Sequence, residues 1–231
     1  LKGSAYHAAG ARRIGLPIVA VINNDIVGGV AGADAAPNTD AVRLFSRGDD
    51  GGPSRRLARY VASVADRYAG LEAKVIPQGD RPGRGGDHQS FSVEGYPAVR
   101  VIAAQEDTER QHSPRDTPAG LDPAYQAAVV RLDLAVVASL ALAPPEVAAA
   151  PVVQEAAGGV AVRWAAVDHP AVAGYWLATR ARGDGRYTLA RWVSGATEAT
   201  LAMEPDPDLR VVVATSDARG HMSLFSPEGS P

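Results

Sequence analysis

Residues 84–117 read RGGDHQSFSVEGYPAVRVIAAQEDTERQHSPRDT, and this stretch decides the fold class of the first part of the chain. A short apolar segment, residues 97–103, stands between a polar turn at residues 85–88 and a polar loop at residues 111–117. A buried strand whose flanking loops carry His and Asp is a common way for α/β enzymes to present metal ligands or acid–base groups. The stretch therefore predicts an α/β enzyme domain with a site beside this strand.

The segments around this stretch alternate between strand and helix patterns. Residues 17–22 form an apolar run that is typical of a central parallel strand buried on both faces, and the run leads directly to Asp25. Further helix and strand patterns occur at residues 3–13, 42–46, 54–68, 73–76 and 123–142. We predict that residues 1–143 form an α/β domain with a mostly parallel sheet and flanking helices.

The composition changes after this domain. Residues 144–150 are rich in Pro and Ala and are typical of a stiff linker. In residues 151–231 the helical period is lost, and short alternating segments recur about every ten residues between Gly, Asp and Pro turns. This second part is predicted to be an all-β sandwich of six or seven strands.

Charge and composition exclude several classes of partner. The net charge is −3 and no basic block is present, so nucleic acid is not an expected partner. No uninterrupted apolar run approaches about 18 residues, so no membrane span is expected. The chain has no cysteine, which rules out disulfides and thiolate metal ligands.

The motifs of the first part resemble those of the zinc-dependent aminopeptidase and glutaminyl cyclase family of metallopeptidases. The resemblance covers residues 1–143 and implies a partial zinc-exopeptidase fold. The matching elements are the Gly86-Asp87-His88 turn, Phe91, the Gly95-Tyr96-Pro97 strand entry and the loop of residues 112–117, His-Ser-Pro-Arg-Asp-Thr. Residues 151–231 resemble a fibronectin type III domain, with Trp164 and Tyr175 at core positions but no Tyr near Leu209.

The resemblance implies two zinc ions and assigns residues to them. Asp25 and His112 match family positions that each ligate a different ion, although an Asp at a strand end is often only a turn former and a lone loop His is often solvated. Asp87 and His88 match a turn beside the metals and are expected in a supporting or pocket role, with helix capping by Asp87 as the alternative.

Other parts of the family site do not occur in this sequence. The family has a His-x-Asp motif, a bridging Asp and a Glu-Glu pair that includes the general base, and none of them is present. Leu1-Lys2-Gly3-Ser4 resembles the segment that follows the Glu-Glu pair, so we expect the catalytic Glu upstream of Leu1.

The resemblance implies a secreted zinc aminopeptidase that hydrolyses amino-terminal residues from peptide substrates. Without the upstream ligands and base, the chain as given is expected to be inactive. Two alternatives stay open: a truncated or degenerate peptidase that acts as a non-catalytic binding module, and a glutaminyl cyclase-like acyltransferase. Nothing in the sequence indicates a ligand for the sandwich.

Overall fold

The computed structural model describes residues 1–31 and 36–231, and the chain divides into two compact units. The first unit is Leu1–Ala135 and the second is Val136–Pro231. Residues 28–40 are rich in Gly, Ala and Asp, a composition that predicts a loop, and residues 32–35 of this segment lie outside the described part of the chain. The α/β domain followed by a β-sandwich that the sequence predicts is confirmed.

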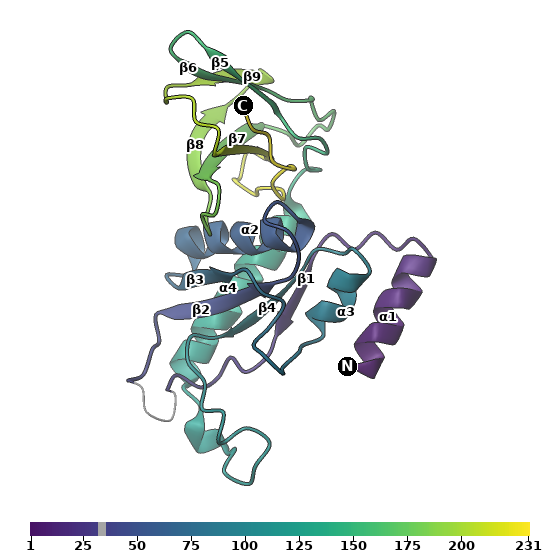
Figure 1. Ribbon diagram of the computed structural model, residues 1–231, viewed down its shortest axis with the longest axis vertical. Helices are drawn as coiled ribbons and strands as arrows, with labels where there is room; N and C mark the ends of the chain where they lie inside the picture. Colours follow the sequence, from purple (N-terminus) through teal and green to yellow (C-terminus); the bar gives the residue numbers. More distant parts are fainter. Residues whose placement is uncertain (32–35) are drawn as a thin grey trace. The chain divides into compact units, whose positions relative to one another are not determined.

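A four-stranded sheet with the order β1-β4-β2-β3 forms the centre of the first unit. Its strands are β1 (Val21–Asn24), β2 (Ala41–Ser46), β3 (Glu72–Ile76) and β4 (Ala98–Ala103). The pairs β1–β4 and β2–β3 are parallel, whereas β2–β4 is antiparallel (Figure 1). All six residues of β4 are buried, as expected for a strand covered on both faces.

The run at residues 17–22 was wrongly expected to form a central strand. β1 is an edge strand of the described sheet, and its first three residues are only half-buried. It begins at Val21, whose partner is Ala98, the first residue of β4. Residues 17–20 precede this first pair of the β1–β4 ladder, and their apolar character alone does not make them part of the strand.

Three helices, α1 (Lys2–Arg13), α2 (Pro53–Tyr68) and α3 (His88–Val93), lie in the first unit, with a short 3-10 turn, η1 (Pro118–Gly120). A fourth helix, α4 (Pro123–Leu142), begins in the first unit and ends in the second. α1 and α3 lie side by side, and the Oγ atoms of Ser4 and Ser90 are 3.0 Å apart (Figure 1). Gly52 is the N-cap of α2, and Pro53 occupies its first turn, where its missing N–H costs no hydrogen bond. The Ser54 hydroxyl accepts a hydrogen bond from the backbone N–H of Ala98 at 3.1 Å, which connects α2 to β4.

α4 is the one described helix whose length and composition would allow it to cross a bilayer, with a mean hydropathy of 1.5 in its most apolar window. Core helices of soluble proteins pass the same test, so this is weak evidence for a membrane span. Arg131 and Asp133 interrupt the apolar sequence, and Tyr125 and Leu132 are buried. The absence of a membrane partner therefore stays a prediction.

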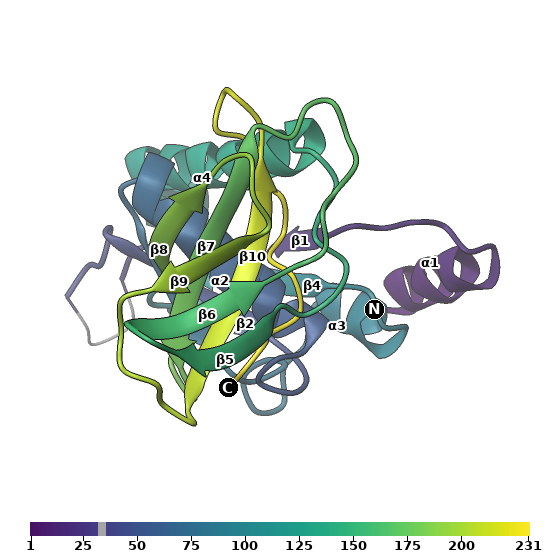
Figure 2. The ribbon, with the colours of Figure 1, turned by 90° about the horizontal axis from the view of Figure 1, so that it is seen from above.

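The second unit is a sandwich of two antiparallel sheets, with the orders β5-β6-β9 and β10-β7-β8 (Figure 2). The strands are β5 (Val152–Ala156), β6 (Gly159–Arg163), β7 (Gly174–Ala181), β8 (Thr188–Val193), β9 (Glu198–Leu201) and β10 (Leu209–Ser216). The period-2 pattern of the sequence places alternate residues in the space between the sheets.

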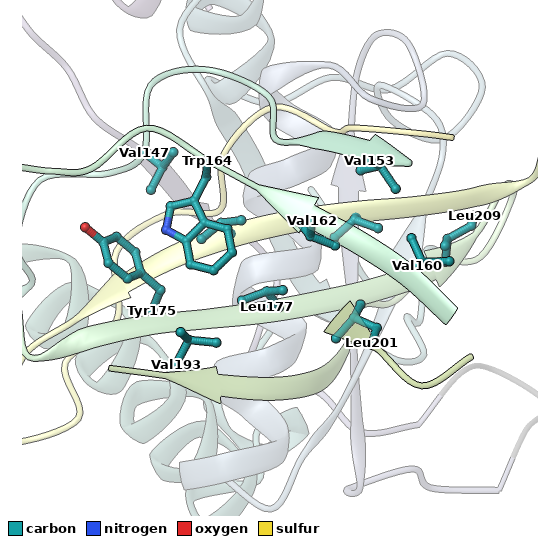
Figure 3. Packing of buried hydrophobic residues seen from close by; sticks show 12 residues of the cluster. Val147, Val153, Val160, Val162, Trp164, Tyr175, Leu177, Val193, Leu201 and Leu209 are labelled. Atoms are coloured by element: carbon teal, nitrogen blue, oxygen red, sulfur yellow. The ribbon is translucent and has the colours of Figure 1, made fainter. Parts of the chain in front are cut away.

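Trp164 and Tyr175 lie in the core of this sandwich, as the sequence predicts (Figure 3). Their rings meet edge to face at 5.4 Å, and the Tyr175 hydroxyl accepts a hydrogen bond from the Val167 backbone at 3.0 Å. Val147, which lies within the predicted linker 144–150, is also fully buried in this core. The linker segment is thus packed against the second unit at this residue.

Candidate functional site

The candidate site begins where β1 and β4 end at the same edge of the sheet. Asn24 is in register with Val101, and the backbone N–H of Asp25 donates to the Val101 carbonyl at 3.1 Å. Parallel pairing therefore brings the loop after Asp25 and the loop after Ala103 together. Ligand sites of α/β proteins usually occupy this edge of the sheet.

Asp25 is held by a buried arginine. Its Oδ2 atom lies 2.8 Å from Arg100 Nη2, and its side chain is 43% exposed. Arg100 is almost completely buried in β4 and makes a second ion pair with the buried Asp80, at 2.5 Å. Burial raises the pKa of Asp80, but hydrogen bonds from the Arg81 backbone and from Arg100 outweigh it, so the pKa is lowered. Asp80 therefore stays charged and fixes Arg100, which fixes Asp25.

The same network continues into the loop that carries His112. Arg81 pairs with both Asp80 and Glu106, and Arg43 Nη2 lies 2.5 Å from Glu106 Oε2. Gln111 Nε2 donates to Glu106 Oε1 at 3.1 Å, which connects the residue before His112 to the network. Charge-assisted contacts thus order the loops after β3 and β4.

Two residues of the site have an unusual backbone conformation. Ile26 has φ 60° and His112 has φ 59°, and they are the only residues other than glycine with positive φ in the described ranges 1–31 and 36–231. This region is unfavourable for L-residues, above all for a β-branched one, and such strain concentrates at functional sites. One outlier directly follows Asp25 and the other is His112 itself, which supports a site at these positions.

The environment of His112 would permit it to act as a ligand. Its side chain is exposed, and its imidazole has no hydrogen-bond partner in the described part of the chain. Both ring nitrogens are therefore available, and carboxylate and imidazole donors suit zinc.

The number of donors nevertheless falls short of a metal site. No group of three His, Cys, Asp or Glu side chains that could hold an ion occurs among residues 1–31 and 36–231. Catalytic zinc normally has about three protein ligands. Asp25 and His112 thus fit zinc in chemistry, but further ligands would have to come from outside the described residues.

Asp87 and His88 have different environments. Asp87 is exposed and stands at the N-cap position of α3, but its side chain makes no capping hydrogen bond. His88 is fully buried, and its Nε2 bonds to the Gly79 carbonyl at 2.7 Å. Burial lowers the pKa of His88, so the ring is neutral and Nε2 is the donor.

The double glycine before this turn has a steric cause. A Cβ atom at Gly86 would lie 2.8 Å from Asn23 Oδ1 and 2.9 Å from His88 Nδ1. The backbone of the turn therefore passes close to Asn23 in β1, which only a residue without a Cβ atom permits.

A cavity of about 440 Å³ lies between the loops that follow β1 and β4. Its lining includes Ile26, next to Asp25, and Gln111, next to His112. Neither Asp87 nor His88 belongs to the lining. The cavity size is typical of small-molecule sites, which range from about 300 to 1,000 Å³.

Sequence reasoning missed the network of Arg100, Asp80 and Glu106. One signal was visible: Arg100 is the only charged residue in the apolar segment 97–103. A charge in a strand buried on both faces requires a partner, because an unpaired buried charge is very costly.

Comparison with known families confirms the resemblance. The sequence model described as "Peptidase family M28" matches residues 1–137. The chain belongs to peptidase family M28. The match ends within α4 and leaves the sandwich outside the family domain.

Curated relatives of this M28 chain occur in fungi. A "Probable zinc metalloprotease" of Pyricularia oryzae is 32% identical over 178 residues, which are 64% of this chain and 36% of the relative. One of Leptosphaeria maculans is 27% identical over 237 residues, 89% of this chain and 54% of the relative. The chain thus spans about a third to a half of the length of these relatives.

Solved structures give weaker likenesses to this M28 chain. An aminopeptidase from Aneurinibacillus sp. strain AM-1 is 23% identical with a TM-score of 0.41 and covers 58% of this chain and 29% of its own. A human titin module, A71, is 19% identical with a TM-score of 0.32 and covers 38% of this chain and 89% of its own. Scores this low do not support an assignment of activity.

Proposed function

We propose that the protein is a zinc-dependent metallo-exopeptidase that removes amino-terminal residues from peptides. Membership of the M28 family and the names of the fungal relatives support the metallopeptidase class. The observation that carries the proposal is the position of Asp25 and His112, each adjacent to a residue that lines the same cavity, Ile26 and Gln111. A peptide whose first side chain filled this cavity would have its scissile bond near both predicted ligands.

In this proposal the residues of the chain bind and orient. Arg100 occupies one oxygen of Asp25 and leaves the other for a metal ion, and Glu106 positions the loop of His112 through Gln111. Zinc held by a complete ligand set would polarise the scissile carbonyl and lower the pKa of a bound water. Asp25 and His112 would supply only part of that set.

Aminoacyl p-nitroanilides test the proposal, with this chain and a longer form, extended at its amino terminus by the missing family motifs, compared in the presence of zinc. The longer form should release p-nitroaniline from free aminoacyl substrates but not from N-acetylated ones, because an exopeptidase requires the free amine. The 231-residue chain should release none, because its described residues hold too few ligands. Cleavage of the acetylated substrates would show an endopeptidase and contradict the proposal.

The shortage of ligands also favours a second function, that of a non-catalytic binding module. A module of this kind would bind peptides and show no zinc-dependent hydrolysis in either form. Formation of pyroglutamyl products from glutaminyl peptides would instead indicate a glutaminyl cyclase-like acyltransferase.

A further inference from the structure

We propose that the loop Arg47-Gly48-Asp49, which follows β2, is a docking site for a receptor protein that holds a divalent cation beside acidic side chains. Arg-Gly-Asp is the tripeptide that adhesion receptors of this chemistry recognise. In the complex, the Asp49 carboxylate ligates the cation and the Arg47 guanidinium pairs with a carboxylate of the receptor. The proposal concerns a surface outside the cavity lining and does not depend on the peptidase function.

The tripeptide occurs twice in the sequence. One copy, residues 47–49, lies in the loop between β2 and α2, and the other, residues 182–184, lies in the loop between β7 and β8. All six residues are exposed. Because a three-residue match arises easily by chance, the sequence alone assigns no function to either copy. Their structural environments distinguish them.

Both charged groups of the first copy are available to a partner. Within the described ranges 1–31 and 36–231, neither the Arg47 guanidinium nor the Asp49 carboxylate makes a hydrogen bond or an ion pair. The two groups also do not pair with each other, although only one residue separates them in the sequence. A receptor that binds them therefore breaks no polar contact of these groups within the described chain.

Gly48 gives this copy a bend that other residues would adopt only with strain. Its φ is 98°, in the left-handed region where a Cβ atom is unfavourable. A Cβ atom at this position would nevertheless meet no heavy atom beyond its two chain neighbours within 4 Å. The glycine is therefore required by the direction of the backbone and not by crowding, and the space around it is open to the surface of a partner.

Two buried arginines of α2 hold the base of this loop. Arg55 donates to the Ser46 hydroxyl at 2.9 Å and to the Gly48 carbonyl at 3.3 Å. Arg59 donates to the Asp50 carbonyl at 2.6 Å. Both arginines are at most 2% exposed, so these contacts are shielded from water. They order the backbone within and beside the tripeptide, and an ordered loop loses less conformational entropy on binding.

The second copy has a structural explanation that the first copy lacks. Asp184 accepts a hydrogen bond at Oδ2 from the backbone N–H of Ala181 at 3.1 Å. Its own backbone N–H donates to the Ala181 carbonyl at 3.1 Å. Asp184 therefore closes the turn after β7, a common use of Asp in loops. We expect only the first copy to bind the receptor.

Surface plasmon resonance with an immobilised integrin ectodomain, a receptor whose ligand site holds a divalent cation, tests the proposal. The 231-residue chain should bind in the presence of Mg²⁺ and should not bind after chelation with EDTA. A soluble Arg-Gly-Asp peptide should displace the chain, whereas an Arg-Gly-Glu peptide should not. These measurements use the unaltered chain, so they do not depend on the folding of a variant.

Asp49→Glu keeps the charge but moves the carboxylate outward by one methylene group. It should weaken binding by at least about tenfold, because Mg²⁺ demands near-ideal ligand geometry. Asp184→Glu makes the same change in the second copy and is the matched control, which should leave the affinity unchanged. Thermal unfolding of both variants shows whether each is folded.

Three results would overturn the proposal. The first is no binding of the unaltered chain, and the second is binding that survives EDTA or the Arg-Gly-Asp peptide. The third is binding that Asp184→Glu weakens as much as Asp49→Glu does, because the loop after β2 would then not be the docking site.

Discussion

The guanidinium of Arg100 lies 2.8 Å from Oδ2 of Asp25, and this ion pair connects the interior of the sheet to the candidate site. Arg100 is fixed from behind by Asp80, whose side chain is 1% exposed. An exposed carboxylate at a strand end would otherwise sample several rotamers. The chain Asp80–Arg100–Asp25 limits that freedom and gives Asp25 a defined orientation.

Replacement of Arg100 by Met should destabilise the first unit by about 3–5 kcal/mol. The substitution leaves the carboxylate of Asp80 buried with one partner fewer, and an uncompensated buried charge has a cost of this order. Urea denaturation followed by circular dichroism measures the effect, and Arg84→Met at an exposed position is the control. A variant at Arg100 as stable as the parent would show that the ion pairs are not maintained in solution.

Acid should weaken the contribution that the Asp80 carboxylate makes to the free energy of unfolding. Its pKa is lowered in the folded state relative to about 3.9 in the unfolded chain, so its stabilising contribution is complete well above pH 4. The contribution is lost as the pH falls through the folded-state pKa. The difference in unfolding free energy between the parent and Asp80→Asn should therefore be largest near pH 7 and shrink towards pH 3. A difference that stays constant over this range would contradict the assignment.

His112→Gly should be more stable than His112→Ala by about 1 kcal/mol. The φ of 59° at His112 is unfavourable for any residue with a Cβ atom, and glycine avoids this cost. The same pair of substitutions at Ser113, which is not among the positive-φ residues, should show no such advantage for glycine. Differential scanning calorimetry of the four variants distinguishes the two cases. If His112→Ala were more stable than His112→Gly, the positive φ at residue 112 would be refuted.

Val147→Ala should destabilise the sandwich by about 2 kcal/mol, because it opens a cavity in a fully buried position. Val152→Ala at a residue that is 56% exposed is the matched control and should change stability by less than about 0.5 kcal/mol. Both are measured by chemical denaturation monitored through tryptophan fluorescence. Equal effects would mean that residues 144–150 form a free linker rather than part of the second unit.

Local sequence patterns predicted most of the elements. The apolar segment at residues 97–103 forms β4, and the segment with a helical period at residues 54–68 forms α2. The bounds of each element lie within one residue of the predicted ones. In both cases burial on a sheet face or a helix face sets a period that is readable from neighbouring residues. The edge position of β1 could not be read in this way, because it depends on which strands pair.

Much of the site depends on contacts that are distant in the sequence. Asp25 and His112 were predicted from family motifs, whereas the partners of Arg100 lie 20 and 75 positions away in the chain. The positive φ of His112 was also invisible, because no glycine marks that position.

The zinc content of the longer form of the protein and of its variants tests the central claim most directly. Metal stoichiometry is measured by inductively coupled plasma mass spectrometry after dialysis, together with the initial rate of hydrolysis. Asp25→Ala and His112→Ala should each lose bound zinc and turnover, because each removes one of about three ligands of an ion. His169→Ala, at an exposed position of the sandwich, should retain both. Full zinc content and activity in either the Asp25 or the His112 variant would show that the site lies elsewhere.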